Sequence, residues 1–159
     1  MLPRSMHRPL LIASAATVIP FALYLFAVGT WASSAALALA LFAVVAYSAP
    51  PLRFKEVPLL DSVTSPAHFT LPAVVGALIG GAFIGGYLGL ALAAFFLWGM
   101  ASHALGAVQD VQSDRAGGLR SVATELGARL TTRSASTLYL AAAALCFALP
   151  SPGWAVGLL

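Results

Sequence analysis

Two long stretches without a charged side chain constrain this sequence more than any other feature. Residues 9–52 and 62–109 contain no Asp, Glu, Lys or Arg. Each stretch is about twice the roughly 20 residues that a helix needs to cross the hydrocarbon core of a bilayer. The whole chain is 60% hydrophobic and only 8% charged, whereas soluble domains carry about 25% charged residues. Because unpaired backbone groups are costly in lipid, we predict an all-α, multi-pass transmembrane helical bundle.

Turn-forming residues divide these stretches into separate spans. Gly29 and Trp31 mark a break in the first stretch, and Pro50-Pro51 ends its second half because proline lacks a backbone donor. A signal peptide is the competing interpretation of residues 1–30, but their apolar part is longer than the usual 7–15 residues. Glycines spaced four apart between Gly76 and Gly89 predict close helix packing. We predict five spans and the start of a sixth, over residues 9–28, 32–47, 66–85, 87–109, 134–150 and 154–159.

The charged residues predict the topology. All of them lie in three islands, residues 4–8, 53–61 and 110–133. One pair of predicted spans separates successive islands, so all three emerge on the same side, and the positive-inside rule makes that side cytoplasmic. We therefore expect a cell-membrane protein whose polar site faces the cytoplasm, although scattered loop charges would give a similar pattern. The few basic residues lack the clustered face of a nucleic-acid-binding protein.

The third island carries the residues best suited to chemistry. Asp110 and Asp114 are four residues apart, so on a helix they lie on one face, one turn apart. Two such carboxylates repel each other unless a cation lies between them, and Mg²⁺ typically takes one or two carboxylates plus phosphate oxygens. Arg115 and Arg120 flank two glycines just beyond this pair. This pattern favours a phosphorylated ligand and a divalent metal ion.

Two blocks of sequence carry a resemblance to a known family. Tyr47-Ser-Ala-Pro-Pro-Leu-Arg-Phe-Lys55, and later Asp110-Val-Gln-Ser-Asp114 with its downstream Gly-Gly and Ser-Val-Ala-Thr-Glu-Leu-Gly127, resemble motifs of the UbiA superfamily of intramembrane prenyltransferases. The segment from Ser102 to Asp110 is most similar to lycopene elongases and related carotenoid prenyltransferases. The resemblance covers nearly the whole chain.

The resemblance implies an enzyme that uses Mg²⁺ to transfer a prenyl group from an allylic diphosphate to a hydrophobic acceptor. That acceptor would be lycopene or a related carotenoid, as in C50 carotenoid biosynthesis; an aromatic acceptor of a quinone pathway is the alternative. Asp110 and Asp114 would be catalytic metal ligands. Residues implied in diphosphate binding are Tyr47, Arg53, Lys55, Arg115 and Arg120, and possible contacts to the acceptor or cavity are Asp61 and His103.

The chain also departs from the family. The first aspartate-rich motif of the family begins Asn-Asp, but this sequence contains no asparagine, and family members have about nine spans. We therefore expect residues 1–159 to be a single domain that is incomplete on its N-terminal side and on its C-terminal side. Such a chain would be inactive alone and would need a chain carrying the N-terminal half. A non-catalytic membrane subunit or degenerate homologue remains an alternative. A small transporter would have ionisable groups near the bilayer midplane. The charged residues of this chain are expected at one membrane face, which disfavours a transporter.

Overall fold

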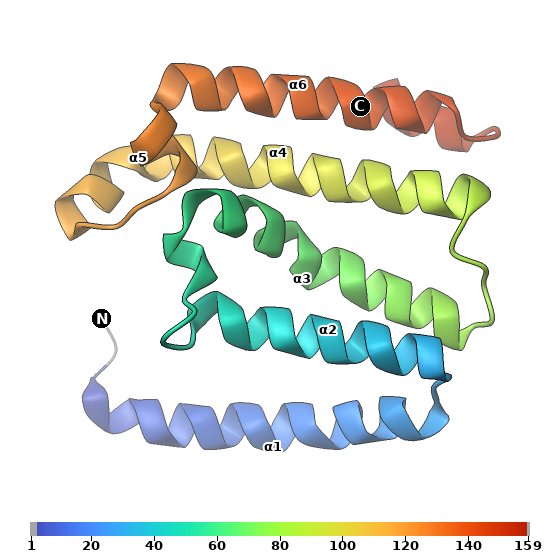
Figure 1. Cartoon of the computed structure of the whole chain (residues 1–159), viewed down its shortest axis with the longest axis horizontal. Helices are drawn as coiled ribbons and strands as arrows, with labels where there is room; N and C mark the ends of the chain where they lie inside the picture. The colour runs from blue at the N-terminus through green and yellow to red at the C-terminus, as the bar shows by residue number, and fades with distance from the viewer. Residues whose placement is uncertain (1–2, 159) are drawn as a thin grey trace.

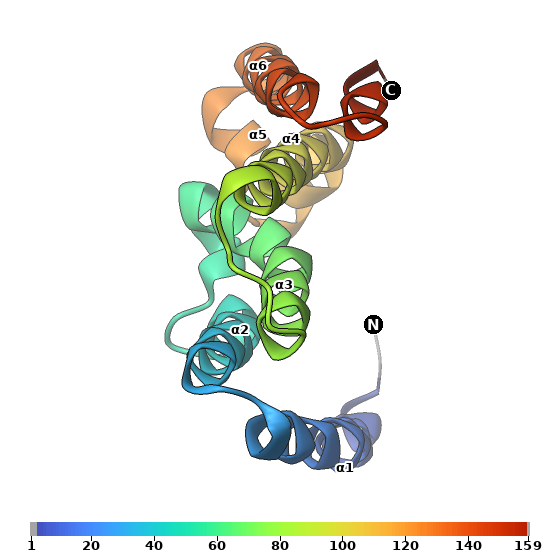
Figure 2. The same ribbon diagram turned by 90° about the vertical axis from the view of Figure 1, so that its right-hand side faces the viewer.

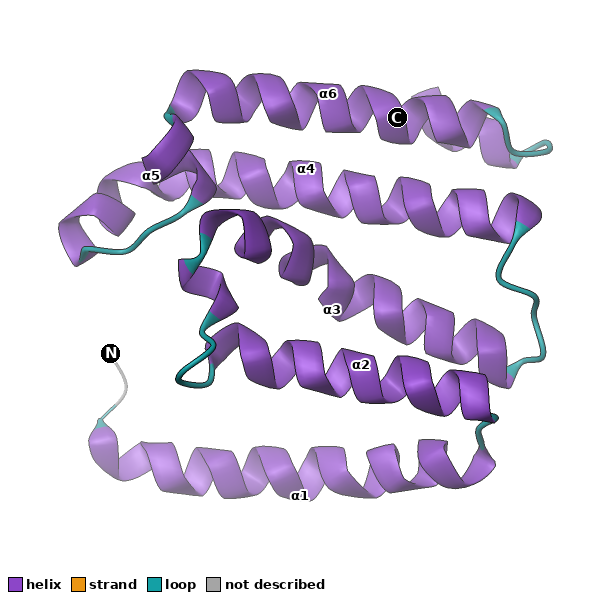
Figure 3. Ribbon diagram, viewed as in Figure 1, coloured by secondary structure: helices purple, strands orange, loops and turns teal. Residues whose placement is uncertain are grey.

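The computed structural model describes residues 3–158, and these residues form helices without any strand (Figures 1 and 3). The all-α prediction is therefore confirmed. The helices are α1 (Arg4–Val28), α2 (Trp31–Ser48), the 3₁₀ helix η1 (Phe54–Glu56), α3 (Pro58–Ile79), α4 (Gly86–Gly117), α5 (Val122–Leu126), α6 (Ala128–Phe147) and the 3₁₀ helix η2 (Gly153–Leu158).

The long helices lie side by side in chain order and alternate in direction (Figure 1). Seen along their axes in Figure 2, they form one curved row, with α1 at one edge and α6 near the other. Each long helix packs on the next one in the row, and α1 has the least contact with its neighbour. Because the helices alternate in direction, the charged connections all lie on one side of the bundle, at the helix ends nearest the N-terminus in Figure 1. This side is called the charged end. The predicted gathering of the charged islands is thus observed.

Within residues 3–158, four helices, α1 to α4, are long and apolar enough to cross a membrane, and α6 is not among them. The fifth predicted span corresponds to α6, which begins at Ala128 and carries Arg129 and Arg133 in its first two turns. These arginines and the hydroxyl residues that follow them make α6 more polar than the other four helices. In place of the start of a sixth span, Gly153–Leu158 forms η2, which packs on α6; Leu159 lies outside the described residues.

Two helix boundaries differ from the prediction in ways that affect the site. The third helix begins at Pro58 rather than at residue 66, because proline fits the first position of a helix, where no backbone donor is needed. The fourth runs to Gly117 rather than to residue 109, and Gly118 ends it with φ +66°. There the Leu119 N–H donates to the Asp114 carbonyl at 2.8 Å. Asp61, Asp110 and Asp114 therefore all lie on helices.

The packing that fixes the charged end depends on small residues. Ala101, Ala104 and Ala107 of α4 form a buried cluster with Ala135 of α6 and with α5. Between α3 and α4 the close contact occurs at Gly99, where a Cβ atom would overlap Phe69 and Pro66. The predicted glycine contacts between helices are wrong. At Gly76, Gly81 and Gly89 a Cβ would meet no atom of the described residues within 4 Å, and at Gly80 and Gly85 it would meet only atoms of the same helix or connection.

Candidate active site

A polar pocket lies at the charged end of the bundle. Its volume is about 360 Å³. It is lined by Tyr47, Arg53, Lys55, Glu56, Asp61, His103, Gly106, Ala107, Asp110, Asp114, Leu119, Arg120 and Ser121. Eight of the nine predicted site residues belong to this set, and Arg115 is the exception. Residues more than sixty positions apart in the sequence are thus brought to one cavity.

Three parts of the chain bring these side chains together. Tyr47 lies in the last turn of α2, and Arg53 precedes the short helix η1 in the connection to α3. Asp61 lies in the first turn of α3. On α4 the spacing of His103, Asp110 and Asp114 places them on one stripe, and all three line the pocket. The long helix α4 therefore contributes His103, Asp110 and Asp114 to the pocket lining.

The charge of the pocket suits a metal-bound anion. Four acidic side chains, Glu56, Asp61, Asp110 and Asp114, face three basic ones, Arg53, Lys55 and Arg120, so the formal charge is −1 with His103 neutral. Neither Asp110 nor Asp114 is in a salt bridge within residues 3–158.

Within residues 3–158, no group of three or more His, Cys, Asp or Glu side chains is placed to hold a metal ion. A pair of free carboxylates nevertheless fits Mg²⁺, which usually takes only one or two from the protein and fills its octahedron with water and phosphate oxygens.

Two of the three basic residues already contact glutamates. Arg53 forms a salt bridge with Glu56, and Arg120 Nε donates to Glu125 Oε1 at 2.8 Å. The Arg120 guanidinium lowers the pKa of the Glu125 carboxyl below its usual value, first through this hydrogen bond and then through its charge. Lys55 has no salt-bridge partner in the described chain. An incoming anion thus meets one unpaired cation and two that it must share with carboxylates.

A second polar pair lies deeper in the pocket. His103 Nε2 lies 2.7 Å from Oδ2 of Asp61 and joins α4 to α3. Asp61 is 5% exposed, and its other oxygen, Oδ1, is buried without a hydrogen-bond partner among the described residues. The Tyr47 ring packs edge-on against His68, and the Tyr47 side chain lies near Asp61. Tyr47 therefore lies within reach of Asp61, but Oδ1 forms no hydrogen bond with it.

A family model described as the UbiA prenyltransferase family matches residues 5–159, which is nearly the whole chain. The chain belongs to the UbiA prenyltransferase family. Among curated proteins, it is 54% identical to a lycopene elongase/hydratase of Corynebacterium glutamicum over 99% of this chain and 55% of that protein. It is 53% identical to the C(50) beta-cyclic carotenoids biosynthesis protein LbtBC of Dietzia sp., over 92% of this chain and 34% of that protein.

More distant relatives carry the same name. A lycopene elongase/hydratase of Haloferax volcanii is 43% identical over 76% of this chain and 39% of that protein. The chain spans about half the length of the first of these relatives, and less of the other two. No solved structure matches the chain significantly.

Some residues that line the pocket of this UbiA family chain were not predicted from the sequence as site residues. Glu56 follows Arg53 by three residues, a spacing that signals a helical ion pair. Gly106 lies between His103 and Asp110 on the stripe of α4, and a Cβ there would meet no atom within 4 Å. Ser121 lines the pocket and also caps α5, where it accepts from the Thr124 N–H. The capping signal was readable in the sequence, whereas the contact with the pocket was not.

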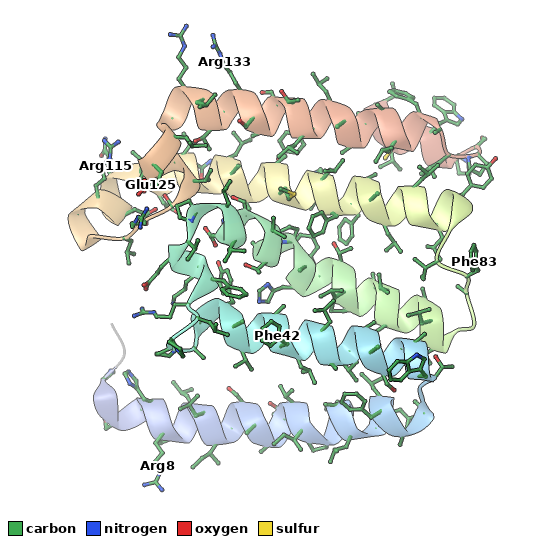
Figure 4. All side chains as sticks on the ribbon, viewed as in Figure 1. Arg8, Phe42, Phe83, Arg115, Glu125 and Arg133 are labelled. Carbon is green, nitrogen blue, oxygen red and sulfur yellow. The ribbon has the colours of Figure 1, made fainter. Side chains whose placement is uncertain are left out.

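Arg115 is the predicted residue that lies apart from the pocket lining. It is exposed in the last turn of α4 (Figure 4), one residue beyond Asp114. Neighbouring helical positions differ by about 100° around the axis, so Arg115 and Asp114 point in different directions. Its predicted role in binding diphosphate is therefore not supported by its position.

A second cavity of about 800 Å³ lies between α4, α6 and η2 and shares no lining residue with the polar pocket. Its lining is mainly apolar and includes Phe95 and Trp98, whose rings are stacked at 6.0 Å. No Asp, Glu, Lys or Arg lines it. Of these two cavities, only the polar pocket is therefore lined by side chains that can bind a polyanion.

Proposed function

We propose that this chain forms the diphosphate-binding part of a prenyltransferase site, which transfers a prenyl group from an allylic diphosphate to a carotenoid. The observation that carries the proposal is the polar pocket, where a pair of free carboxylates on α4 faces Arg53, Lys55 and Arg120. Membership of the UbiA prenyltransferase family gives the reaction class.

The charge of the pocket supports binding of the donor together with Mg²⁺. A diphosphate is a polyanion, and a pocket of formal charge −1 would repel it. Asp110 and Asp114 would hold one divalent cation, which would bring the formal charge of the pocket to +1, so that Arg53, Lys55 and Arg120 could contact the same anion. When bound, Mg²⁺ supplies positive charge that stabilises the diphosphate as its bond to the prenyl carbon breaks.

The residues of this chain orient the donor. Arg53 and Lys55 lie on the connection between α2 and α3, whereas Arg120 lies on the connection between α4 and α5. The two connections would hold the diphosphate from two sides and leave the prenyl chain directed toward the apolar helices. A low-water environment preserves the allylic cation until the acceptor attacks it.

The names of the relatives favour a carotenoid acceptor. The Corynebacterium and Haloferax proteins are named lycopene elongase/hydratase, and the Dietzia protein is named for C(50) beta-cyclic carotenoids. We propose lycopene or a related carotenoid as the acceptor here. A quinone-pathway acceptor has no comparable support among these relatives.

The remaining wall of the site and its orientation are also part of the proposal. The chain covers 55% of the Corynebacterium relative, and within residues 3–158 the pocket offers one pair of carboxylates without a salt bridge, Asp110 and Asp114. We propose that sequence corresponding to the rest of that relative supplies the opposing carboxylates, in the same polypeptide or in a partner chain. The enzyme would lie in the cell membrane with the polar pocket facing the cytoplasm.

The test is prenyl transfer in membranes that contain this chain together with the part of the Corynebacterium relative that it does not match. Allylic diphosphates of several lengths are supplied with lycopene, and products are identified by chromatography and mass. We expect Mg²⁺-dependent elongation that is lost in Asp110→Asn and in Asp114→Asn, since both changes keep the size and remove the charge. Arg133→Gln, which alters an exposed arginine outside the pocket (Figure 4), is the control. Full activity in either aspartate variant removes that residue from the site.

A further inference from the structure

We propose that His103 is the proton acceptor of the reaction and that Asp61 is its positioning residue. The inference rests on the proposed function, and it assigns a catalytic role that binding of the diphosphate does not require. It is drawn from the hydrogen bond between His103 Nε2 and Asp61 Oδ2 at 2.7 Å and from the place of this pair in the pocket.

The buried carboxylate is the first argument. A buried polar atom without a hydrogen-bond partner costs about 1–3 kcal/mol, and Asp61 Oδ1 is such an atom. Asp61 is 5% exposed, yet it lines the pocket. A stable membrane helix has no need of a carboxylate there. Such residues usually mark functional paths in membrane proteins.

The geometry of the ring is the second argument. Since Oδ2 of an ionised carboxylate can only accept, Nε2 of His103 carries the proton of this hydrogen bond. In the neutral ring the other nitrogen, Nδ1, then carries the lone pair. Nδ1 has no hydrogen bond with the described residues. This is the arrangement in which a carboxylate fixes the tautomer of a histidine base and stabilises the imidazolium that forms.

The depth of the pair is the third argument. His103 precedes Asp110 by seven residues on α4, which is two turns and about 10 Å along the helix. Both side chains line the same pocket. A donor whose diphosphate lies at Asp110 and Asp114 would extend its prenyl carbons toward His103. The base is thus placed near the reacting carbons and away from the leaving group.

The reaction releases a proton, which an acceptor must take up. The C–O bond of the donor breaks and its electron pair leaves on the diphosphate. The π electrons of the acceptor form the new C–C bond, so the positive charge moves to the neighbouring acceptor carbon. That cation is neutralised when an adjacent C–H bond gives its electrons to a new C=C bond and its proton to His103 Nδ1. If water adds instead, the proton released by the water goes to the same atom.

The test compares how much diphosphate is released with how much elongated carotenoid is formed, in the same prenyl-transfer assay. We expect His103→Gln to lower the ratio of carotenoid to diphosphate by at least about tenfold, which is below the 10²–10⁴-fold that a positioned base commonly contributes. Added imidazole would raise that ratio in His103→Gly. His7→Gln is the matched control, because His7 is exposed near the start of α1 and lies outside the pocket lining.

The outcomes separate the two proposals. If the wild-type protein transfers prenyl groups and His103→Gln keeps the wild-type ratio, the assignment of His103 is wrong and the proposed function stands. If His103→Gln does not fold, Asp61→Asn is measured in its place, since it keeps the shape of the side chain and removes its charge. An unchanged ratio in Asp61→Asn then overturns the inference. If the wild-type protein transfers nothing, both proposals fail.

Discussion

Gly106 provides a sharp test of the polar pocket because stability and activity are expected to move in opposite directions there. It lies on α4 between His103 and Asp110, and a Cβ added to it would meet no atom within 4 Å. Replacing glycine inside a helix stabilises it by about 0.5–1 kcal/mol, and leucine has a helix propensity close to that of alanine. We therefore expect Gly106→Leu to raise Tm by about 1–4 °C in a protein of this size.

In the proposed site, the same leucine would occupy space that the substrate needs. Forcing extra methylenes into a filled site costs about 1–3 kcal/mol. Applied to the bound transition state, this corresponds to a loss of about 5- to 150-fold in kcat/KM. Gly106→Ala, which adds a single methyl group, would give the same stabilisation with a smaller loss.

Gly89 offers the matched control. It lies on the same helix, its Cβ position is also open, and it lines neither cavity. Gly89→Leu would therefore give a similar rise in Tm without the loss of activity. Thermal unfolding in detergent and steady-state prenyl transfer measure the two quantities. The reasoning is refuted if Gly106→Leu keeps the wild-type kcat/KM, or if Gly89→Leu loses as much activity.

Three further results are expected. Glu56→Gln would lower the KM for the allylic diphosphate about two- to fivefold, because removing one negative charge near the anion lowers its binding free energy by about 0.5–1 kcal/mol at high dielectric. An unchanged KM would place the diphosphate elsewhere. Arg120 lowers the pKa of Glu125. Their salt bridge is therefore fully formed above the ordinary pKa of glutamate and is lost as pH falls through the lowered pKa of Glu125. In a carboxyl NMR titration, Arg120→Gln would raise that pKa. In a cysteine-free background of intact cells, Phe83→Cys in the connection between α3 and α4 (Figure 4) would react with an impermeant thiol reagent. Ala116→Cys, near the C-terminal end of α4, would not react. The reverse pattern would contradict a cytoplasmic site.

The sequence was sufficient to predict the parts of the fold that follow from single-residue chemistry. Charge-free stretches predict apolar helices whatever the tertiary context, and alternation of the spans brings the charged islands to one end. The short helix at 122–126 was also predictable, since Ser121 caps its start and Gly127 ends it with φ +78°. These features are local, so they need no knowledge of neighbouring helices.

The helix boundaries and the pairings between side chains were not predictable in the same way. The charges of residues 53–61 favour a polar loop, but Pro58 starts a helix there and turns Asp61 into the bundle. The hydrogen bond between Asp61 and His103 spans 42 residues, and no local pattern specifies it. Gly99 likewise resembles any other glycine of the spans until Phe69 and Pro66 are placed against it.

The length of α4 connects the two halves of the proposed chemistry. Its 32 residues extend about 48 Å, well beyond the roughly 30 Å hydrocarbon core of a bilayer. One helix can therefore present Asp110 and Asp114 where ions and diphosphate are hydrated, and His103 two turns closer to the lipid. A polyanion and a long apolar acceptor favour different solvents, and their reacting atoms must still meet. A single helix that crosses the boundary between the two solvents would fix the distance between the proposed leaving-group site and the proposed base, independently of the two connections that carry Arg53, Lys55 and Arg120.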